Sequence, residues 1–251
     1  MDKKEQLVQE DQYDFPYHYI PDWSGDEFSQ VRYWSWGFRY IGGLMVALDC
    51  LSNHEFRSLV DVGCGDGRFL RDVARTWPSR RTLGIDYSKR AIGLAKALNP
   101  SGNYRCLNII DDTQDEVFDV ATAIEVLEHI PPEDLDLFVA GISELLGPGG
   151  TLIVTVPHSN LAVSKKHFQH FDSEKLQKTL EPCFDIERFI PFDRLTRPVA
   201  LTYWSLSRIA NHVVVTNSSI SSALFKMYRQ YLLYRCDEST CARIAVVCTK
   251  K

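Results

Sequence analysis

The 251-residue chain contains no apolar run of about 20 residues, the length that a membrane-spanning helix requires. Its first residues, MDKKEQLVQEDQYDF, are polar and acidic and lack the apolar core of a secretory signal. The seven cysteines are scattered, and none form a Cys-x-x-Cys pair, which argues against a disulfide framework and a zinc knuckle. These absences predict a cytoplasmic protein with reduced thiols.

Charge is unevenly distributed along the chain, although the net charge is only −5. Residues 188–251 hold ten Lys and Arg against three Asp and Glu, so the remainder is strongly acidic. The basic end is suited to an anionic substrate or to peripheral contact with a membrane surface, and it is equally typical of a solvated helical face. The acidic balance of the main part disfavours a nucleic-acid partner.

From residue 58 onward, short apolar runs alternate with amphipathic stretches, which predicts strands that alternate with helices. The expected strands are SLVDVG, TLGID, YRCLNI, FDVATAI, TLIVTVP, FDIERFIPF and ARIAVVCTKK. Ser88 is placed to cap the helix that follows the second strand. This order predicts an α/β fold with a doubly wound, mostly parallel sheet of seven strands and helices on both faces.

A glycine-rich turn, VDVGCGDGRF, joins the first strand to its helix. Glycines at 63, 65 and 67 allow a ligand to approach bare backbone, and the following helix offers free N–H groups. Asp86 ends the second strand, about 20 residues later, where an acid commonly binds ribose hydroxyls. The spacing is G-x-G-x-G and not the G-x-G-x-x-G of dinucleotide sites, which disfavours an NAD-dependent dehydrogenase.

Four segments together resemble the motifs of class I S-adenosylmethionine-dependent methyltransferases: VDVGCGDGRF, GIDYS, FDVATAIEVLEHI and LLGPGGTLIVTVP. The resemblance covers about residues 55 to 190 and the final strand. It implies S-adenosyl-L-methionine as the cofactor and a final strand that runs antiparallel to its neighbours.

The resemblance also implies which residues hold the cofactor. Asp61 is expected near the methionine ammonium, Asp86 at both ribose hydroxyls, and Tyr87 against the adenine. Asn108 stands where the family often has Asp at the adenine amino group, and its carbonyl oxygen can accept the same hydrogen bond. The full expected set is Asp61, Gly63, Cys64, Gly65, Gly67, Asp86, Tyr87, Asn108, Ile109 and Glu125.

Methyl transfer to a hydroxyl requires a base that removes the proton, and a neutral histidine suits that role. Candidates lie in EVLEHIPPED, which follows the fourth strand, and in PHSNLAVSKKHFQHFDSEKL, which follows the fifth and carries His158, His167 and His170. We predict His129 as the base, with Glu125 and His170 as the other catalytic residues, because both segments start at the cofactor edge of the sheet.

A metal-dependent alternative uses the same segments. Glu128, His129 and His170, joined by Glu125, could hold a divalent cation. This arrangement resembles the metal-dependent small-RNA 3′-end 2′-O-methyltransferases, and ubiquinone-pathway O-methyltransferases carry a similar stretch. Ile130 follows His129, however, so the double histidine of the RNA enzymes is missing. The predicted site therefore contains no metal.

The chain is expected to comprise a helical and aromatic lid (1–54), the cofactor-binding α/β domain (55–193), a helical insert that caps the substrate (194–240) and the final strand (241–251). Apolar residues at helical spacing, among them Leu224, Met227, Tyr228 and Tyr231, predict that the insert packs one face on the domain.

We predict a methyltransferase that acts on a hydroxyl or amine of a small molecule, a saccharide or a lipid-linked intermediate. The alternatives are a metal-dependent RNA 2′-O-methyltransferase and a non-catalytic scaffold that binds the cofactor.

Overall fold

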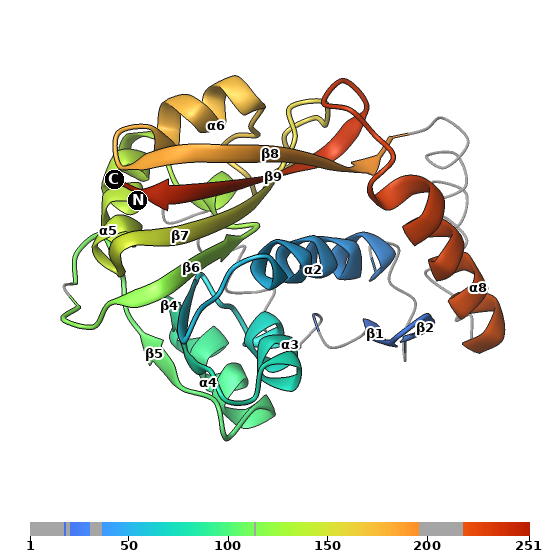
Figure 1. Ribbon diagram of the computed structural model, residues 1–251, viewed down its shortest axis with the longest axis horizontal. Coiled ribbons are helices and arrows are strands. Elements are labelled where there is room, and N and C mark those ends of the chain that lie inside the picture. The colour runs from blue at the N-terminus through green and yellow to red at the C-terminus, as the bar shows by residue number, and fades with distance from the viewer. Residues whose placement is uncertain (1–17, 19–20, 31–36, 113, 196–217) are drawn as a thin grey trace.

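A single seven-stranded sheet forms the centre of the protein in the computed structural model, which describes residues 18, 21–30, 37–112, 114–195 and 218–251 (Figure 1). Its strand order is β5-β4-β3-β6-β7-β9-β8. The strands are β3 (Ser58–Val62), β4 (Arg81–Asp86), β5 (Tyr104–Cys106), β6 (Phe118–Ile124), β7 (Leu146–Pro157), β8 (Phe184–Arg194) and β9 (Cys241–Lys250). β9 runs antiparallel to both β7 and β8, and the other pairs are parallel. The predicted fold, including its antiparallel last strand, is confirmed.

Helices cover both faces of this sheet, as the alternation of strands and helices predicted. The helices are α2 (Gly37–Ser52), α3 (Arg68–Thr76), α4 (Lys89–Leu98), α5 (Leu135–Glu144), α6 (Ser173–Leu180) and α8 (Ser218–Tyr228). Ile142 of α5 and Leu176 of α6 belong to one buried cluster. Leu44 of α2, Val73 of α3 and Ile92 of α4 belong to the other. The α4 helix starts at the predicted cap, because Ala91 N donates to Ser88 Oγ at 3.1 Å.

The N-terminal region contains a β-hairpin that the sequence did not reveal. Strands β1 (Pro21–Ser24) and β2 (Glu27–Gln30) pair antiparallel around Gly25 and Asp26. The Phe28 ring packs 4.5 Å from the Phe38 ring and 5.0 Å from the Phe225 ring of α8. The Arg229 guanidinium donates to Asp26 Oδ1 at 2.8 Å. The described parts of the predicted lid and insert therefore pack on each other. Residues 1–17, 19–20 and 31–36 of the predicted lid and residues 196–217 of the predicted insert lie outside the described residues.

The face that the insert buries differs from the prediction. α8 continues into a π-helical turn, η4 (Arg229–Leu233). Among the side chains that the structure describes in these two elements, the buried ones are Phe225, Tyr228 and Leu233. Leu224, Met227 and Tyr231 are exposed instead, so their predicted packing was wrong. The reason is that the hairpin and α2 meet the neighbouring face of α8, which the spacing alone could not show. Among the described helices, none is long and apolar enough to cross a bilayer.

Gly42 determines how closely α8 can approach α2. A Cβ atom at this position would lie 2.5 Å from Tyr228 Oη and 2.9 Å from Leu233 Cδ1. We therefore expect Gly42→Ala to reduce the free energy of unfolding by about 1–3 kcal/mol, the range for an overpacked core. Gly43 is the matched control on the same helix, because its Cβ would meet nothing closer than Phe192 at 4.0 Å. Urea unfolding should show Gly43→Ala unchanged or stabilised; equal losses in both variants would contradict the steric explanation.

Candidate active site

A cavity of about 960 Å³ lies where β3, β4 and β6 end, at the carboxyl edge of the parallel strands. Arg39, Tyr40 and Leu44 of α2 form part of its wall. Gly67 of the predicted set does not line the cavity. The predicted residues that do line it are Asp61, Gly63, Cys64, Gly65, Asp86, Tyr87, Asn108, Ile109, Glu125, His129 and His170. Sequence reasoning thus placed these residues around one cavity, which is where a doubly wound sheet binds its ligand.

The glycine turn requires glycine for conformational and steric reasons. Gly63, Gly65 and Gly67 have φ angles of 73°, 55° and 77°, in the left-handed region that side chains disfavour. A Cβ at Gly63 would also lie 2.6 Å from Val126 Cγ2. The N–H groups of Gly63 and Cys64 both donate to Ile85 O, at 2.8 and 3.0 Å. These bonds fix the turn against the end of β4, and Gly67 begins α3 rather than facing the cavity.

Two buried carboxylates lie beneath this turn. Asp86 accepts hydrogen bonds from Gly65 N at 2.9 Å and from Ser88 N at 2.8 Å, one on each oxygen. Each carboxylate oxygen can accept more than one bond, so Asp86 keeps acceptor capacity for a ligand hydroxyl. Asp61 accepts from Thr122 Oγ1 at 2.7 Å. Burial, assisted by the negative charge of Asp86, raises the pKa of Asp61 to about 7.

The expected adenine end of the cavity differs in detail from the prediction. Tyr87 is 37% exposed and Ile109 is buried, and both line the cavity. The Asn108 side chain is used within its own turn, because its Oδ1 accepts from Ile110 N at 3.3 Å and its Nδ2 donates to Asp111 Oδ2. Asp111 also lines the cavity and was not among the predicted residues.

Glu125 follows β6 with a φ of 56°, a left-handed conformation that is unusual for a non-glycine residue. Its carboxylate accepts from Arg243 Nε at 2.9 Å and from Thr155 Oγ1 at 3.2 Å. Arg243 also lies 3.2 Å from Asp193 Oδ2, which in turn lies 3.1 Å from Arg39 Nε. Arg39 and Arg243 line the cavity but were not predicted from the sequence. They lie far from the other site residues along the chain and come close to them only in the folded protein.

Hydrogen bonds to backbone carbonyls define the tautomers of the clustered histidines. His129 Nδ1 lies 2.9 Å from Lys166 O, and His170 Nδ1 lies 3.0 Å from Leu161 O. Since a carbonyl only accepts, both Nδ1 atoms carry the proton. His170 Nε2 is then an acceptor, and His167 Nδ1, at 2.8 Å, donates to it. His129 and His167 therefore each present an unprotonated Nε2, whereas both nitrogens of His170 are engaged.

Burial, with the positive charges nearby, favours the neutral forms of the His129 and His167 rings. Burial, together with the nearby Lys166 ammonium, lowers the pKa of His129 to about 4. Burial is also the main reason that the pKa of His167 falls to about 2. Glu128 is only 1% exposed, and burial, reinforced by the Glu125 charge, raises its pKa well above the usual range. One oxygen of Glu128, Oε2, has no hydrogen-bond partner.

Glu128, His129 and His167 come together in the cavity wall, with their ligating atoms all within 4.8 Å of one another. His167 was named in the sequence as a candidate but was not chosen. The sequence signal that could have identified His167 is its His-x-x-His spacing to His170, because this spacing allows one imidazole to orient the other.

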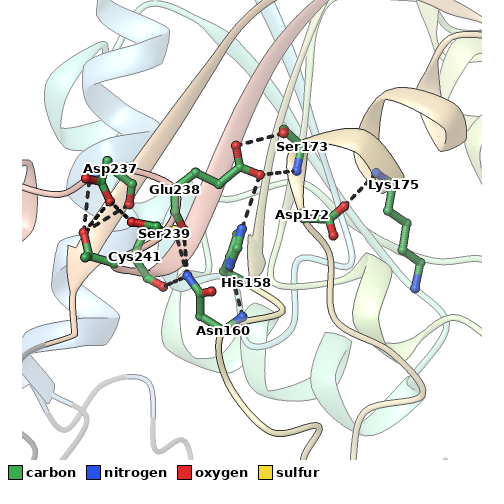
Figure 2. A network of polar contacts seen from close by, with 10 residues as sticks. His158, Asn160, Asp172, Ser173, Lys175, Asp237, Glu238, Ser239 and Cys241 are labelled. Atoms are coloured by element: carbon green, nitrogen blue, oxygen red, sulfur yellow. Dashed lines mark hydrogen bonds and ion pairs between the residues drawn. The ribbon is translucent and has the colours of Figure 1, made fainter.

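Figure 2 shows how the segment that carries these histidines is held in place. The Glu238 carboxylate accepts from Ser173 N at 2.8 Å and from Ser173 Oγ at 2.9 Å, and it lies 3.5 Å from His158 Nε2. Asn160 Nδ2 donates to Cys241 O at 2.9 Å. Glu238 thus joins both ends of residues 158–173, and His158 is a structural partner of Glu238 rather than part of the cavity lining.

The model of the methyltransferase domain family matches residues 33–221, about three quarters of the chain. The chain therefore belongs to this family. The predicted class, the S-adenosylmethionine-dependent methyltransferases of class I, is confirmed.

Curated relatives include the ubiquinone biosynthesis O-methyltransferases of Bradyrhizobium sp. strain ORS 278 and Methylococcus capsulatus. The first is 31% identical over 118 residues, covering 45% of this chain and 44% of that protein. The second is 36% identical over 111 residues, covering 42% and 45%. The chain thus spans less than half the length of the curated relatives it matches.

Solved structures with the same fold include the N-methyltransferase NodS from Bradyrhizobium japonicum in complex with S-adenosyl-L-homocysteine. It has a TM-score of 0.57 and 15% identity, and the match covers 85% of this chain and 87% of NodS. The [4+2]-cyclase SpnF is similar at a TM-score of 0.60 and 19% identity, covering 85% and 81%. Since one of these is named a cyclase, the fold alone does not assign the reaction.

Proposed function

We propose that the protein transfers the methyl group of S-adenosylmethionine to a hydroxyl oxygen of a small molecule. The observation that carries this proposal is the cavity, which the glycine turn and Asp86 line together with His129 and His167, whose Nε2 atoms are unprotonated. The O-methyltransferase names of the curated relatives support oxygen as the acceptor atom. Cytoplasmic location, and a saccharide or lipid-linked acceptor, stay predictions.

The reaction that we propose is an in-line displacement. The acceptor oxygen attacks the methyl carbon, the new O–C bond forms as the C–S bond breaks, and the sulfonium leaves as a neutral thioether. The hydroxyl proton goes to a base, and His129 Nε2 is available because Lys166 O holds the other ring nitrogen. The chain's main contribution is alignment of the two reactants in an enclosed site.

The other predicted catalytic residues have supporting positions in this scheme. We propose that Glu125, which Arg243 and Thr155 hold, shapes the wall near the methyl group rather than accepting the proton. We propose that His170 orients His167, because both of its ring nitrogens are engaged by neighbours.

Methyl transfer can be tested with labelled S-adenosylmethionine and a panel of phenols, catechols, amines and sugars. Label in the acceptor, with one S-adenosylhomocysteine released per methyl transferred, would support an enzyme, and its bond to oxygen or nitrogen would identify the acceptor atom. Tight cofactor binding without turnover on any acceptor would favour the scaffold alternative.

We expect that cofactor binding releases a proton from the Asp61 carboxyl group. In the free protein its pKa is about 7, so at pH 6.5 a large fraction of Asp61 is protonated. A methionine ammonium placed beside it would lower that pKa, because an opposite charge stabilises the carboxylate. Calorimetry in buffers of different ionisation enthalpy should therefore give different apparent binding enthalpies at pH 6.5, where the ligand amine is already protonated. In the Asp61→Asn variant the apparent binding enthalpy should no longer depend on the buffer. If the enthalpy of the wild type at pH 6.5 is also independent of the buffer, Asp61 does not lie beside the ammonium.

A further inference from the structure

We propose that Tyr104 is a positioning residue for the cofactor, because its ring supports the glycine turn from outside the cavity. Tyr104 begins β5, is 5% exposed and does not line the cavity. Such support acts on binding of S-adenosylmethionine, so it goes beyond the proposed function and is independent of which acceptor atom is methylated. It also gives a reason for Gly67, the predicted cofactor residue that lies outside the cavity lining.

Three glycines from separate segments leave room for the Tyr104 ring. A Cβ atom at Gly67, where α3 begins, would lie 2.6 Å from Tyr104 Oη. A Cβ at Gly84 in β4 would lie 2.6 Å from Cδ1, and one at Gly102 before β5 would lie 2.5 Å from Cε2. Real Cβ atoms essentially never make contacts under 3.0 Å, so a side chain at any of these positions would displace the ring or the backbone around it.

The ring is confined at its base and along both edges of its tip. Tyr104 pairs with Gly84 across the two parallel strands, and Gly84 N donates to Asn103 O at 2.9 Å. Gly67 faces the Cε1 edge of the ring, whereas Gly102 faces the Cε2 edge. A ring that is enclosed in this way transmits a displacement from one edge to the other, because a close-packed interior has little free volume.

The glycine turn connects this ring to the residues of the cofactor cavity. Gly67 N donates to Cys64 O at 3.0 Å, and Cys64 lines the cavity. Between them, Gly65 N donates to Asp86 Oδ2 at 2.9 Å. Loss of the ring would open a void beside Gly67, so the turn would relax toward it and disturb this contact. Asp86, the expected acceptor of the ribose hydroxyls, would then be less precisely placed, although no residue that lines the cavity has changed.

A purely structural role for Tyr104 makes a different prediction. Tyr104 belongs to the buried cluster that also contains Leu70 of α3 and Ile92 of α4, so its loss lowers stability in either case. Phe184, at the start of β8, is likewise a buried aromatic residue, but it lies outside the cavity lining and away from the glycine turn. Only a positioning role predicts that cofactor affinity falls on truncation of Tyr104 and not on truncation of Phe184.

The first test is isothermal titration of the full chain with S-adenosylmethionine and S-adenosylhomocysteine. Tyr104→Leu should weaken binding of both about tenfold, within the range for residues that act on a site without touching the ligand. Tyr104→Phe keeps the ring and should restore the affinity to within about threefold of the wild type. Phe184→Leu is the matched control, because it also removes a buried aromatic ring, and its cofactor affinity should be unchanged.

Gly102→Ala tests the transmission of a displacement across the ring. Gly102 is outside the left-handed region, so its backbone accommodates alanine, and the three atoms nearest to the new Cβ all belong to Tyr104. We expect the affinity to fall about threefold in the wild type and not at all in the Tyr104→Leu background, because the ring atoms that the new methyl group meets are then absent. Gly93→Ala on α4 is the control, since its Cβ would meet nothing within 4 Å.

Thermal unfolding should show that each variant is folded. Unchanged affinity in a folded Tyr104→Leu variant, or an equal loss in Phe184→Leu, would overturn the positioning role. If Tyr104→Leu does not fold, the comparison of Gly102→Ala with Gly93→Ala decides, and equal affinity in these two variants would overturn the role as well. Since every measurement is made without an acceptor, failure of methyl transfer would contradict the proposed function and leave the role of Tyr104 standing.

Discussion

Replacement of Asp86 by alanine is expected to weaken S-adenosylmethionine binding by about 10²- to 10⁴-fold. Two hydrogen bonds from the ribose hydroxyls to a carboxylate contribute about 1.5–3 kcal/mol each, which gives this range. The substitution also frees Gly65 N and Ser88 N, which Asp86 accepts from at 2.9 and 2.8 Å, so the glycine turn loses an anchor. Isothermal titration with S-adenosylmethionine and S-adenosylhomocysteine measures the loss.

Asp86→Asn separates the two effects, because its carbonyl oxygen can replace one carboxylate oxygen while the charge is lost. We expect it to bind more tightly than Asp86→Ala and more weakly than the wild type. Asp136→Ala on α5, outside the cavity lining, is the control and should bind normally. Unchanged affinity in a folded Asp86→Ala variant would sink the assignment of Asp86 to the ribose.

Replacement of Arg243 by glutamine should reduce the free energy of unfolding by about 3 kcal/mol, the lower end of the range for removing one partner of a buried ion pair, because Asp193 is buried whereas the Arg243 and Glu125 side chains are 19% and 26% exposed. Arg243 joins Glu125, which follows β6, to Asp193 near the end of β8. Glu125 and Asp193 have left-handed backbone φ angles of 56° and 62°. Without the guanidinium, the Glu125 carboxylate keeps the Thr155 hydroxyl as a partner, and the Asp193 carboxylate keeps Arg39 and the Tyr228 hydroxyl. The melting temperature should fall by roughly 10 °C.

A double variant tests whether the loss comes from the ion pair. Glu125→Gln combined with Arg243→Gln removes both charges and should recover about 1–3 kcal/mol relative to the sum of the single changes. Lys178→Gln is the contrasting control, because its pair with Glu174 lies on the exposed side of α6 and should not alter the melting temperature. Strict additivity of the two cavity substitutions would show that Arg243 acts through packing alone.

Hydrophobic periodicity and turn chemistry determined the fold class and the cofactor edge. Alternating apolar runs and amphipathic stretches predicted the seven strands and their helices, because each pattern reflects which face is buried. The glycine turn and the position of Asp86 were predictable because both depend on the local sequence. The turn needs a left-handed backbone that glycine allows, and Asp86 ends β4, the strand next to β3. The same local signals predicted the Ser88 cap.

Only the tertiary structure decided the contacts between distant segments. The packing of the hairpin on α8, the buried face of α8 and the joining of Glu125 to Arg243 depend on elements that lie far apart in the chain. The tautomers of His167 and His170 depend on the contact of His170 Nδ1 with Leu161 O and of His170 Nε2 with His167 Nδ1. Sequence spacing indicates which residues can share a face or an edge. Side-chain direction and hydrogen-bond partner, which decide the chemistry, are set only when the sheet brings those edges together.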